Sequence, residues 1–333
     1  MNSVFSILIS VSFLFLRCSS AERLSENKAL YESINPEKPF SDSRFEEING
    51  IKIHYRYGQT KENAYSAKIL MIHGLAGSTY SFRHTAEFLN KNRMLAVSVD
   101  LPAFGYSSRK LGLNHSSYDR ALLISELMKR IDASLPKKTA LLKWNLLGHS
   151  MGGRTVLSMA LEKDISERIQ SLTLIAPAAY FKGSKIGKFL LRISLIRSAA
   201  ETVMAENYLN RKSFDKLLES AYARKPEPEE TAGYLTPLLS PNSEKAFFDV
   251  LINSDESSAA SDFSKIKHPV LILHGKNDSW IPPEESEKLS QEIQGSTLTV
   301  IEHSGHCPME THPDTVNKLI LSFINNSSLP KIN

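Results

Sequence analysis

The chain has 333 residues, of which 41% are hydrophobic and 23% are charged, and this composition excludes a largely disordered protein. The formal net charge is only +4, and no run of lysine and arginine alternates with aromatic residues, so we expect no nucleic-acid partner. The length predicts either one large domain with an insertion or two domains.

The first residues are typical of an export signal. Residues 4–16 are an apolar run that is too short to span a bilayer comfortably, and small polar residues follow it. The lysine or arginine that usually precedes such a run is missing, because residues 1–3 offer only the amino terminus as a positive charge. A buried first strand or helix is the alternative, but no turn residues or polar face organise the segment. We predict that residues 1–20 are a leader that exports the protein to the periplasm or to a membrane.

Cys18 raises the question of lipidation. It follows Arg17 and precedes two serines, which resembles a bacterial lipoprotein cleavage site, except that Arg17 stands where a small residue is usual. Simple export and lipidation at Cys18 both stay open, and lipidation would associate the protein with a membrane through its N-terminus. Cys307 is the only other cysteine, so no structural disulfide is predicted.

Strand-like and helix-like segments alternate after residue 40. Asn49 and Gly50 lie between two alternating segments within residues 45–57, and this pair is the strongest short signal for a β-hairpin. Short apolar runs follow at residues 68–72, 94–99, 144–147, 172–175, 270–273 and 298–301. Several of them lack polar alternation, which predicts strands that are covered on both faces. Strands that alternate with helices favour a parallel sheet.

Apolar residues at helical spacing predict the intervening helices. Residues 118–131 carry one such pattern. Its apolar positions are Leu122, Leu127 and Ile131. The last helix is predicted to begin near Thr311, with Pro313 in the first turn, where a missing N–H is harmless.

Residues 182–267 break this alternation, because they show helix patterns but no convincing strand. The segment is too long for a plain loop, so we predict a helical cap at 182–267 inserted into a core of residues 40–181 and 268–328. Basic and apolar residues share one part of the cap: Lys185, Lys188 and Arg192, with Ile186, Phe189, Leu190 and Ile193. Packing of this apolar face over the pocket is the favoured interpretation, and a basic helix on an anionic membrane is the alternative.

The segment Gly148-His-Ser-Met-Gly152 fits the pattern G-x-S-x-G and lies between a predicted buried strand and a predicted helix. A turn this sharp crowds the backbone, and Gly148 and Gly152 tolerate the crowding at low cost. The turn would present the Ser150 hydroxyl at the carboxyl edge of the sheet, where the following helix directs free N–H groups. We predict that Ser150 is a nucleophile.

A serine hydroxyl needs a base to accept its proton and a carboxylate to hold that base. His306 follows the last predicted strand and should therefore lie at the same sheet edge, with His303 as the alternative base. Asp278 follows the penultimate strand, and Asp100, at the end of an earlier strand, is its competitor. The chain order of serine, acid and histidine favours Asp278 and His306. Asp100 is expected to brace the turn that follows it.

Two backbone N–H groups should hold the oxyanion of the reaction. Met151 immediately follows the predicted nucleophile, and the loop of residues 73–78 follows an early strand. We predict the N–H groups of Met151 and Leu75 as the two donors. An ordinary tight turn is the alternative interpretation of the loop.

Five segments together resemble the α/β-hydrolase superfamily: HGLAGS, DLPAFGYSSR, GHSMGG, HGKNDSWIP and SGHCPMETHP, in this order along the chain. The resemblance implies a mostly parallel sheet of about eight strands flanked by helices, with a helical cap after the sixth strand and neither a metal nor an organic cofactor. It also implies a triad of Ser150, Asp278 and His306, with Leu75 and Met151 as oxyanion donors.

A serine nucleophile in such a protein predicts hydrolysis of small-molecule carboxylic esters through an acyl-enzyme. The haloalkane dehalogenases and epoxide hydrolases of the superfamily attack with a carboxylate, so this serine argues against both groups. Hydrolysis of a carbon–carbon bond in ring-fission products is the alternative reaction, although that group has a more glycine-rich oxyanion loop. A non-catalytic binding protein is the alternative outside enzymes, and the intact set of five site residues argues against it. The oligomeric state is not predicted.

Overall fold

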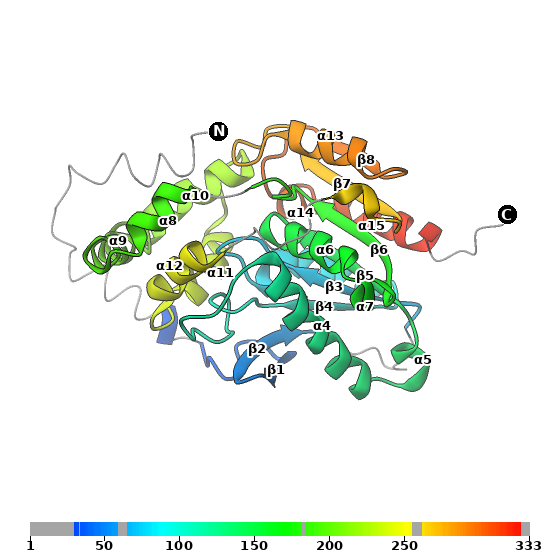
Figure 1. Ribbon diagram of the computed structural model, residues 1–333, viewed down its shortest axis with the longest axis horizontal. Coiled ribbons are helices and arrows are strands. Elements are labelled where there is room, and N and C mark those ends of the chain that lie inside the picture. The colour runs from blue at the N-terminus through cyan, green and yellow to red at the C-terminus, as the bar shows by residue number, and fades with distance from the viewer. Residues whose placement is uncertain (1–29, 33, 59–64, 182–183, 255–261, 328–333) are drawn as a thin grey trace.

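The computed structural model describes residues 30–32, 34–58, 65–181, 184–254 and 262–327. The predicted leader at residues 1–20, with Cys18, lies outside the described residues. The described residues form one eight-stranded sheet with helices packed on both of its faces (Figure 1). The predicted α/β architecture is confirmed.

The strands lie across the sheet in the order β1-β2-β4-β3-β5-β6-β7-β8. Their bounds are β1 Ser43–Ile48, β2 Ile51–Arg56, β3 Ala67–Ile72, β4 Met94–Val99, β5 Trp144–His149, β6 Ile169–Ile175, β7 Val270–Gly275 and β8 Thr297–Ile301. β1 and β2 pair antiparallel, as do β2 and β4, and the remaining pairs are parallel. Because β3 lies between β4 and β5, the strand order reverses beside β3, and ligands of such sheets bind at the carboxyl edge there.

β1 and β2 form the predicted hairpin, in which Ile48 pairs with Ile51. The two turn residues, Asn49 and Gly50, have φ values of 53° and 72°. Positive φ at both positions is what a two-residue type I′ turn requires, and this turn matches the twist of the flanking strands.

Successive residues of the central strands pack on opposite faces of the sheet. On β3, Leu70 and Ile72 belong to one buried cluster, whereas Ile69 and Met71 belong to the other. All residues of β3, β4, β5 and β7 are buried, as the missing polar alternation predicts. The loops that leave these strands at their carboxyl ends therefore start from fixed positions.

Helices α4, α6 and α13 cover the first face, and α3 and α15 cover the second. Their bounds are α4 Ser117–Ser134, α6 Met151–Leu161, α13 Pro283–Glu292, α3 Arg83–Lys91 and α15 Pro313–Ser327. The short helices are α5 Lys137–Ala140, α7 Lys163–Ser166 and α14 Pro308–Thr311, and the 3₁₀ turns are η1 Thr79–Phe82 and η2 Phe263–Lys265.

The helix predicted at residues 118–131 is α4, and two of its three named apolar positions face the core. Leu127 and Ile131 are buried, whereas Leu122 is 45% exposed. Ile124 belongs to the buried face of α4, and Leu122 does not. Leu122 lies two residues before Ile124, roughly 200° around the helix, and so it points away from the sheet.

Between β6 and β7, the described residues form five α-helices, the 3₁₀ turn η2 and no strand. The α-helices are α8 Lys185–Leu191, α9 Ser194–Asn207, α10 Arg211–Tyr222, α11 Pro228–Leu238 and α12 Ser243–Asn253. Helices α10 and α11 join the second buried cluster, for example through Leu218 and Leu235. Helices α8 and α9 pack on each other and on α12. The boundaries predicted for the cap, 182–267, stay a prediction.

The favoured interpretation of the basic segment in the cap is wrong. Ile186, Phe189, Leu190 and Ile193 do not pack over a pocket but are exposed to solvent. The physical reason is that α12 provides the neighbouring protein surface, and it contacts the other side of α8 and α9.

Candidate active site

Ser150 occupies the sharp turn between β5 and α6. Its φ of 53° and ψ of −116° lie outside the regions that side chains normally allow, so the backbone is strained there. The Ser150 N–H donates to the carbonyl of Ile175 at 2.9 Å, and the Ser150 carbonyl accepts from the N–H of Ala178 at 3.0 Å. These two bonds, to the last residue of β6 and to the segment that follows it, hold the strained residue in place.

Gly148 and Gly152 let β5 and α6 approach closely at this turn. A Cβ on Gly148 would lie 2.5 Å from the carbonyl oxygen of Gly152, and one on Gly152 would lie 2.1 Å from that of Ile72. Both contacts are with backbone atoms, which could not move without displacing β3 or α6. The two glycines are therefore required by the close packing that places Ser150 at the sheet edge.

The Ser150 side chain makes no capping hydrogen bond to α6, although serine before a helix usually accepts one from the first turn. The hydroxyl is therefore not used to stabilise the helix. The N–H groups in the first turn of α6 also stay available to an anion, and they lie at the positive end of the helix dipole.

Asp278 and His306 are in direct contact. Asp278 Oδ2 lies 2.7 Å from His306 Nδ1, and because a carboxylate only accepts, Nδ1 carries the proton. Asp278 Oδ1 accepts from the N–H groups of Trp280 at 2.8 Å and Ile281 at 3.0 Å. Burial by itself raises the pKa of Asp278, but the charge of His306 and hydrogen bonds from His274 and His306 outweigh it and hold the pKa below its ordinary value.

His306 is held from three sides. Its backbone N–H donates to the carbonyl of Ala221 on α10 at 2.6 Å. The Trp280 ring stacks on the imidazole, with centroids 5.3 Å apart and planes at 26°. The Asp278 contact fixes the ring orientation, which leaves Nε2 as the nitrogen that can accept a proton.

His149, which precedes Ser150, connects the serine to His306. Its ring lies 4.8 Å from the His306 ring, and its Nε2 lies 2.9 Å from the His306 carbonyl oxygen. Burial, with the nearby charge of His306, lowers the pKa of His149 to about 3, so its ring is neutral and its Nε2–H donates to that carbonyl. His149 has no role predicted from the sequence, although its place inside the G-x-S-x-G segment is a signal that could have indicated one.

The loop that carries Leu75 lies against the serine. A Cβ on Gly74 would be 3.0 Å from the Cβ of Ser150. His73 fixes this loop, because its Nε2 accepts from the N–H of Leu101 at 3.0 Å while its Nδ1–H donates to the carbonyl of Gly74 at 2.6 Å. Burial lowers the pKa of His73, which favours this neutral form. Met151 follows Ser150 in the chain, and Leu75 follows Gly74, which lies against Ser150. The role of Leu75 and Met151 as oxyanion donors stays a prediction.

The sequence model of the alpha/beta hydrolase fold family matches residues 68–313, well over half of the chain. The chain belongs to the α/β-hydrolase fold family. This α/β-hydrolase is 24% identical over 301 residues to an uncharacterized hydrolase of Bacillus subtilis (strain 168), covering 88% of this chain and 99% of that protein.

Two further comparisons agree with this classification. The α/β-hydrolase is 25% identical over 295 residues to a monoacylglycerol lipase of Rattus norvegicus, covering 83% of this chain and 82% of that protein. Among solved structures, it resembles a bacterial membrane phospholipase A with a TM-score of 0.66 and 21% identity, covering 98% of this chain and 93% of that chain. The chain is an enzyme of the hydrolase class.

The α/β-hydrolase contains a second buried aspartate–histidine pair. Asp100 Oδ2 lies 2.7 Å from His54 Nδ1, and His54 Nε2 lies 2.8 Å from Ser43 Oγ. Asp100 also accepts from the N–H groups of Thr79 at 2.5 Å and Tyr106 at 2.8 Å. Asp100 thus joins β2 to the loops after β3 and β4 and braces the turn that follows it, as expected. It does not contact His306.

The alternative base, His303, is exposed and has a φ of 58° in the turn after β8. His306, by contrast, is buried beside Asp278. The structure therefore brings together the aspartate and histidine that the sequence favoured, and His149 links them to Ser150.

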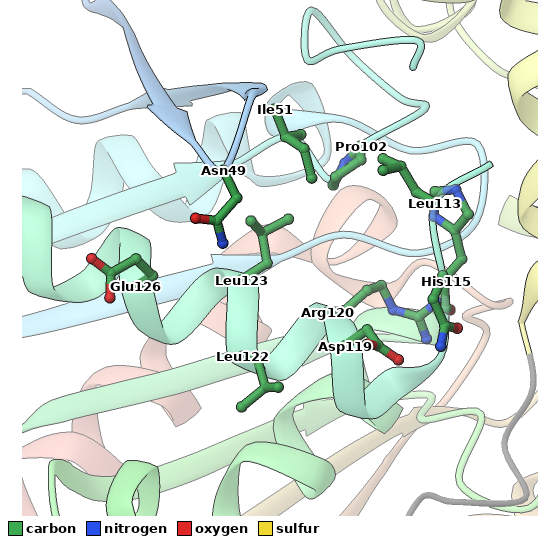
Figure 2. A pocket seen from close by; sticks show the side chains of 11 residues that line it. Asn49, Ile51, Pro102, Leu113, His115, Asp119, Arg120, Leu122, Leu123 and Glu126 are labelled. Carbon is green, nitrogen blue, oxygen red and sulfur yellow. The ribbon is translucent and has the colours of Figure 1, made fainter. Parts of the chain in front are cut away.

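A cavity of about 290 Å³ lies between the β1–β2 turn and α4 of the α/β-hydrolase (Figure 2). Asn49 lines it from the turn, and Arg120 and Leu123 line it from α4. Ser150, Asp278 and His306 are not among its lining residues. This cavity is separate from the candidate active site.

Proposed function

We propose that this hydrolase cleaves carboxylic esters through an acyl-enzyme formed on Ser150. The observation that carries the proposal is the 2.7 Å contact between Asp278 and His306, beside the strained turn that presents Ser150. A histidine with Nδ1–H bonded to a carboxylate has Nε2 free to accept the serine proton. At the strained turn, the serine hydroxyl makes no capping hydrogen bond to α6 and so stays available for the reaction.

The proposed reaction has two stages. Ser150 Oγ attacks the ester carbonyl carbon while its proton passes to His306 Nε2, and Asp278 stabilises the imidazolium that forms. The N–H groups of Leu75 and Met151 hold the oxyanion of the tetrahedral intermediate. Collapse breaks the bond to the alcohol, which leaves with the proton from His306. Water then attacks the acyl-enzyme with His306 again as base, and this releases the acid.

Acyl esters of the lipid type are the proposed substrate class. The support is the similarity to proteins named monoacylglycerol lipase, which recurs at low identity over most of the chain. A further similar protein is named as a methyl ester esterase that acts on a pimeloyl group. Each of these names describes cleavage of an ester of an acyl group. They therefore support an acyl ester as the substrate.

The test is hydrolysis of a panel of p-nitrophenyl esters of increasing acyl length and of a monoacylglycerol. We expect the wild-type protein to cleave members of the panel and Ser150→Ala to lose about 10⁴-fold or more in kcat. Ser43→Ala is the matched control, because Ser43 also contacts a histidine that is bonded to an aspartate. It should keep its activity.

The alternative reaction is decided in the same assay by adding a vinylogous diketone, the substrate type of carbon–carbon bond hydrolases. Cleavage of the diketone without cleavage of any ester would replace the ester proposal. A folded wild-type protein that binds the panel but cleaves nothing would support a non-catalytic role instead.

A further inference from the structure

The outward face of α8 and α9 exposes a concentration of large apolar side chains. The exposed fractions are 75% for Ile186, 67% for Phe189 and 79% for Leu195. Three neighbours are also exposed: Leu190 on α8, Ile193 between the two helices and Ile196 on α9. Scattered exposed apolar residues are normal, but contiguous ones mark surfaces that bind something apolar.

In the part of the chain that the structure describes, helices α8 and α9 contact the rest of the protein on one side only. The described residues do not cover the face that carries the large apolar side chains. Every residue of α9 is described, and none is buried. Lys188 Nζ donates to the carbonyl of Ser254, after α12, and Arg197 donates to the carbonyl of Lys245 on α12 at 3.2 Å. Polar contacts thus attach one side of α8 and α9 to α12 and the residue after it, while the large apolar side chains are exposed.

The first part of this segment is basic, and the two acidic residues of α9, Glu201 and Glu206, come after it. Glu201 pairs with Arg197 at 2.8 Å. Residues 181–200 contain five lysine or arginine residues and no aspartate or glutamate. Lys185 and Arg192 are exposed beside the apolar side chains. Large apolar residues bordered by basic ones are the composition of helices that lie in a membrane interface, where anionic headgroups attract the charges.

We propose that the outward face of α8 and α9 docks onto an anionic membrane surface. Ile186, Phe189 and Leu195 would enter the boundary between headgroups and acyl chains, and Lys185 and Arg192 would contact anionic headgroups. Among the helices of the described residues, none has the length and apolar character that crossing a bilayer requires.

The docking face is close in the chain to the candidate active site. Ala178, whose N–H donates to the Ser150 carbonyl, lies only a few residues before the start of α8 at Lys185. In Figure 1, α8 and α9 occupy one end of the molecule, and α5 lies toward the opposite end. Docking would therefore hold the end of the molecule that carries the inserted helices against the lipid.

Hydrogen exchange of the full chain, read by mass spectrometry, locates the contact. We expect peptides from residues 185–207 to exchange more slowly with vesicles of phosphatidylcholine containing phosphatidylglycerol than without vesicles, and little change with phosphatidylcholine alone. The same protection is expected in Ser150→Ala, because docking does not depend on the proposed reaction. Failure of ester hydrolysis and failure of docking are therefore distinguishable.

Variants in the full chain separate the two contributions. Ile186→Ser with Phe189→Ser and Leu195→Ser should raise the lipid concentration for half-maximal protection by at least about tenfold. Lys185→Gln and Arg192→Gln should each raise it about fivefold. The matched control is Leu141→Ser with Lys137→Gln and Lys138→Gln, which changes exposed residues on and beside α5 and should have no effect.

Thermal unfolding of each variant should match the wild type, since the changed side chains are exposed. Unchanged exchange of residues 185–207 with anionic vesicles would overturn the proposal. Equal protection on neutral vesicles would also overturn it, because the basic residues would then play no part. Protection that appears without lipid as the protein concentration rises would assign the face to a second copy of the chain instead.

Discussion

Asp278 accepts hydrogen bonds at both of its carboxylate oxygens, and this sets the outcome of replacing it by asparagine. Two backbone N–H groups need the acceptor at Oδ1, so the asparagine oxygen should turn to them and its NH₂ group should face His306. That NH₂ donates to Nδ1 and forces the proton of the ring onto Nε2, where it blocks acceptance of the serine proton. We expect Asp278→Asn to lower kcat for ester hydrolysis by about 10³- to 10⁴-fold, with the melting temperature largely kept.

Kinetics on a soluble p-nitrophenyl ester, with thermal unfolding as the folding control, check this expectation. Asp100→Asn is the comparison, because Asp100 holds loops and does not contact His306. Asp100→Asn should lower the melting temperature and leave kcat close to that of the wild type. Nearly wild-type kcat in Asp278→Asn would remove Asp278 from the proposed relay.

At the residue scale, the sequence was sufficient to favour Asp278 and His306, because both follow predicted strands and strand ends share one edge of the sheet. It was insufficient for His149. The contact between His149 and the carbonyl of His306 joins residues 157 positions apart, and it depends on how α10 and the loop after β8 pack. A local pattern does not contain that information.

At the scale of elements, local signals predicted what local chemistry determines. Asn49 and Gly50 adopt positive φ with little strain, so the hairpin could be located from two residues. The strands β3, β4, β5 and β7 are buried throughout, and short, mainly apolar runs without polar alternation predict such strands.

The direction in which a helix faces was less predictable. Leu122 fits a helical period as well as Leu127 does, and only the position of the sheet decides that α4 buries Ile124 instead. The apolar residues of α8 likewise follow helical spacing, but they point outward because α12 supplies the packing surface on the other side. Periodicity thus defines an apolar face, while tertiary contacts decide what covers it.

At the scale of the whole molecule, buried neutral histidines make folding depend on pH. Burial lowers the pKa of His149 to about 3 and that of His115 to about 4, and it lowers the pKa of His73 as well. In the unfolded chain such rings take up a proton near pH 6.5. The unfolded state therefore binds more protons as the pH falls below about 6.5, and stability is lost progressively from there toward the folded pKa values.

His149→Gln isolates one part of this dependence. Glutamine does not titrate, and its amide can still donate to the carbonyl of His306. Between pH 7 and pH 5, we expect the free energy of unfolding of the wild type to fall by about 2 kcal/mol more than that of His149→Gln. Urea unfolding at the two pH values measures the difference. Equal losses in the two proteins would show that His149 does not stay neutral in the folded state.

The central claim is that one serine of the folded protein is activated by the Asp278–His306 pair. Reaction of the full chain with a fluorophosphonate, followed by mass spectrometry of its peptides, tests this claim directly. We predict one label, on Ser150, that is absent from Ser150→Ala and forms far more slowly in His306→Ala. A folded wild-type protein that takes up no label, or a label found on another serine such as Ser43, would contradict the account.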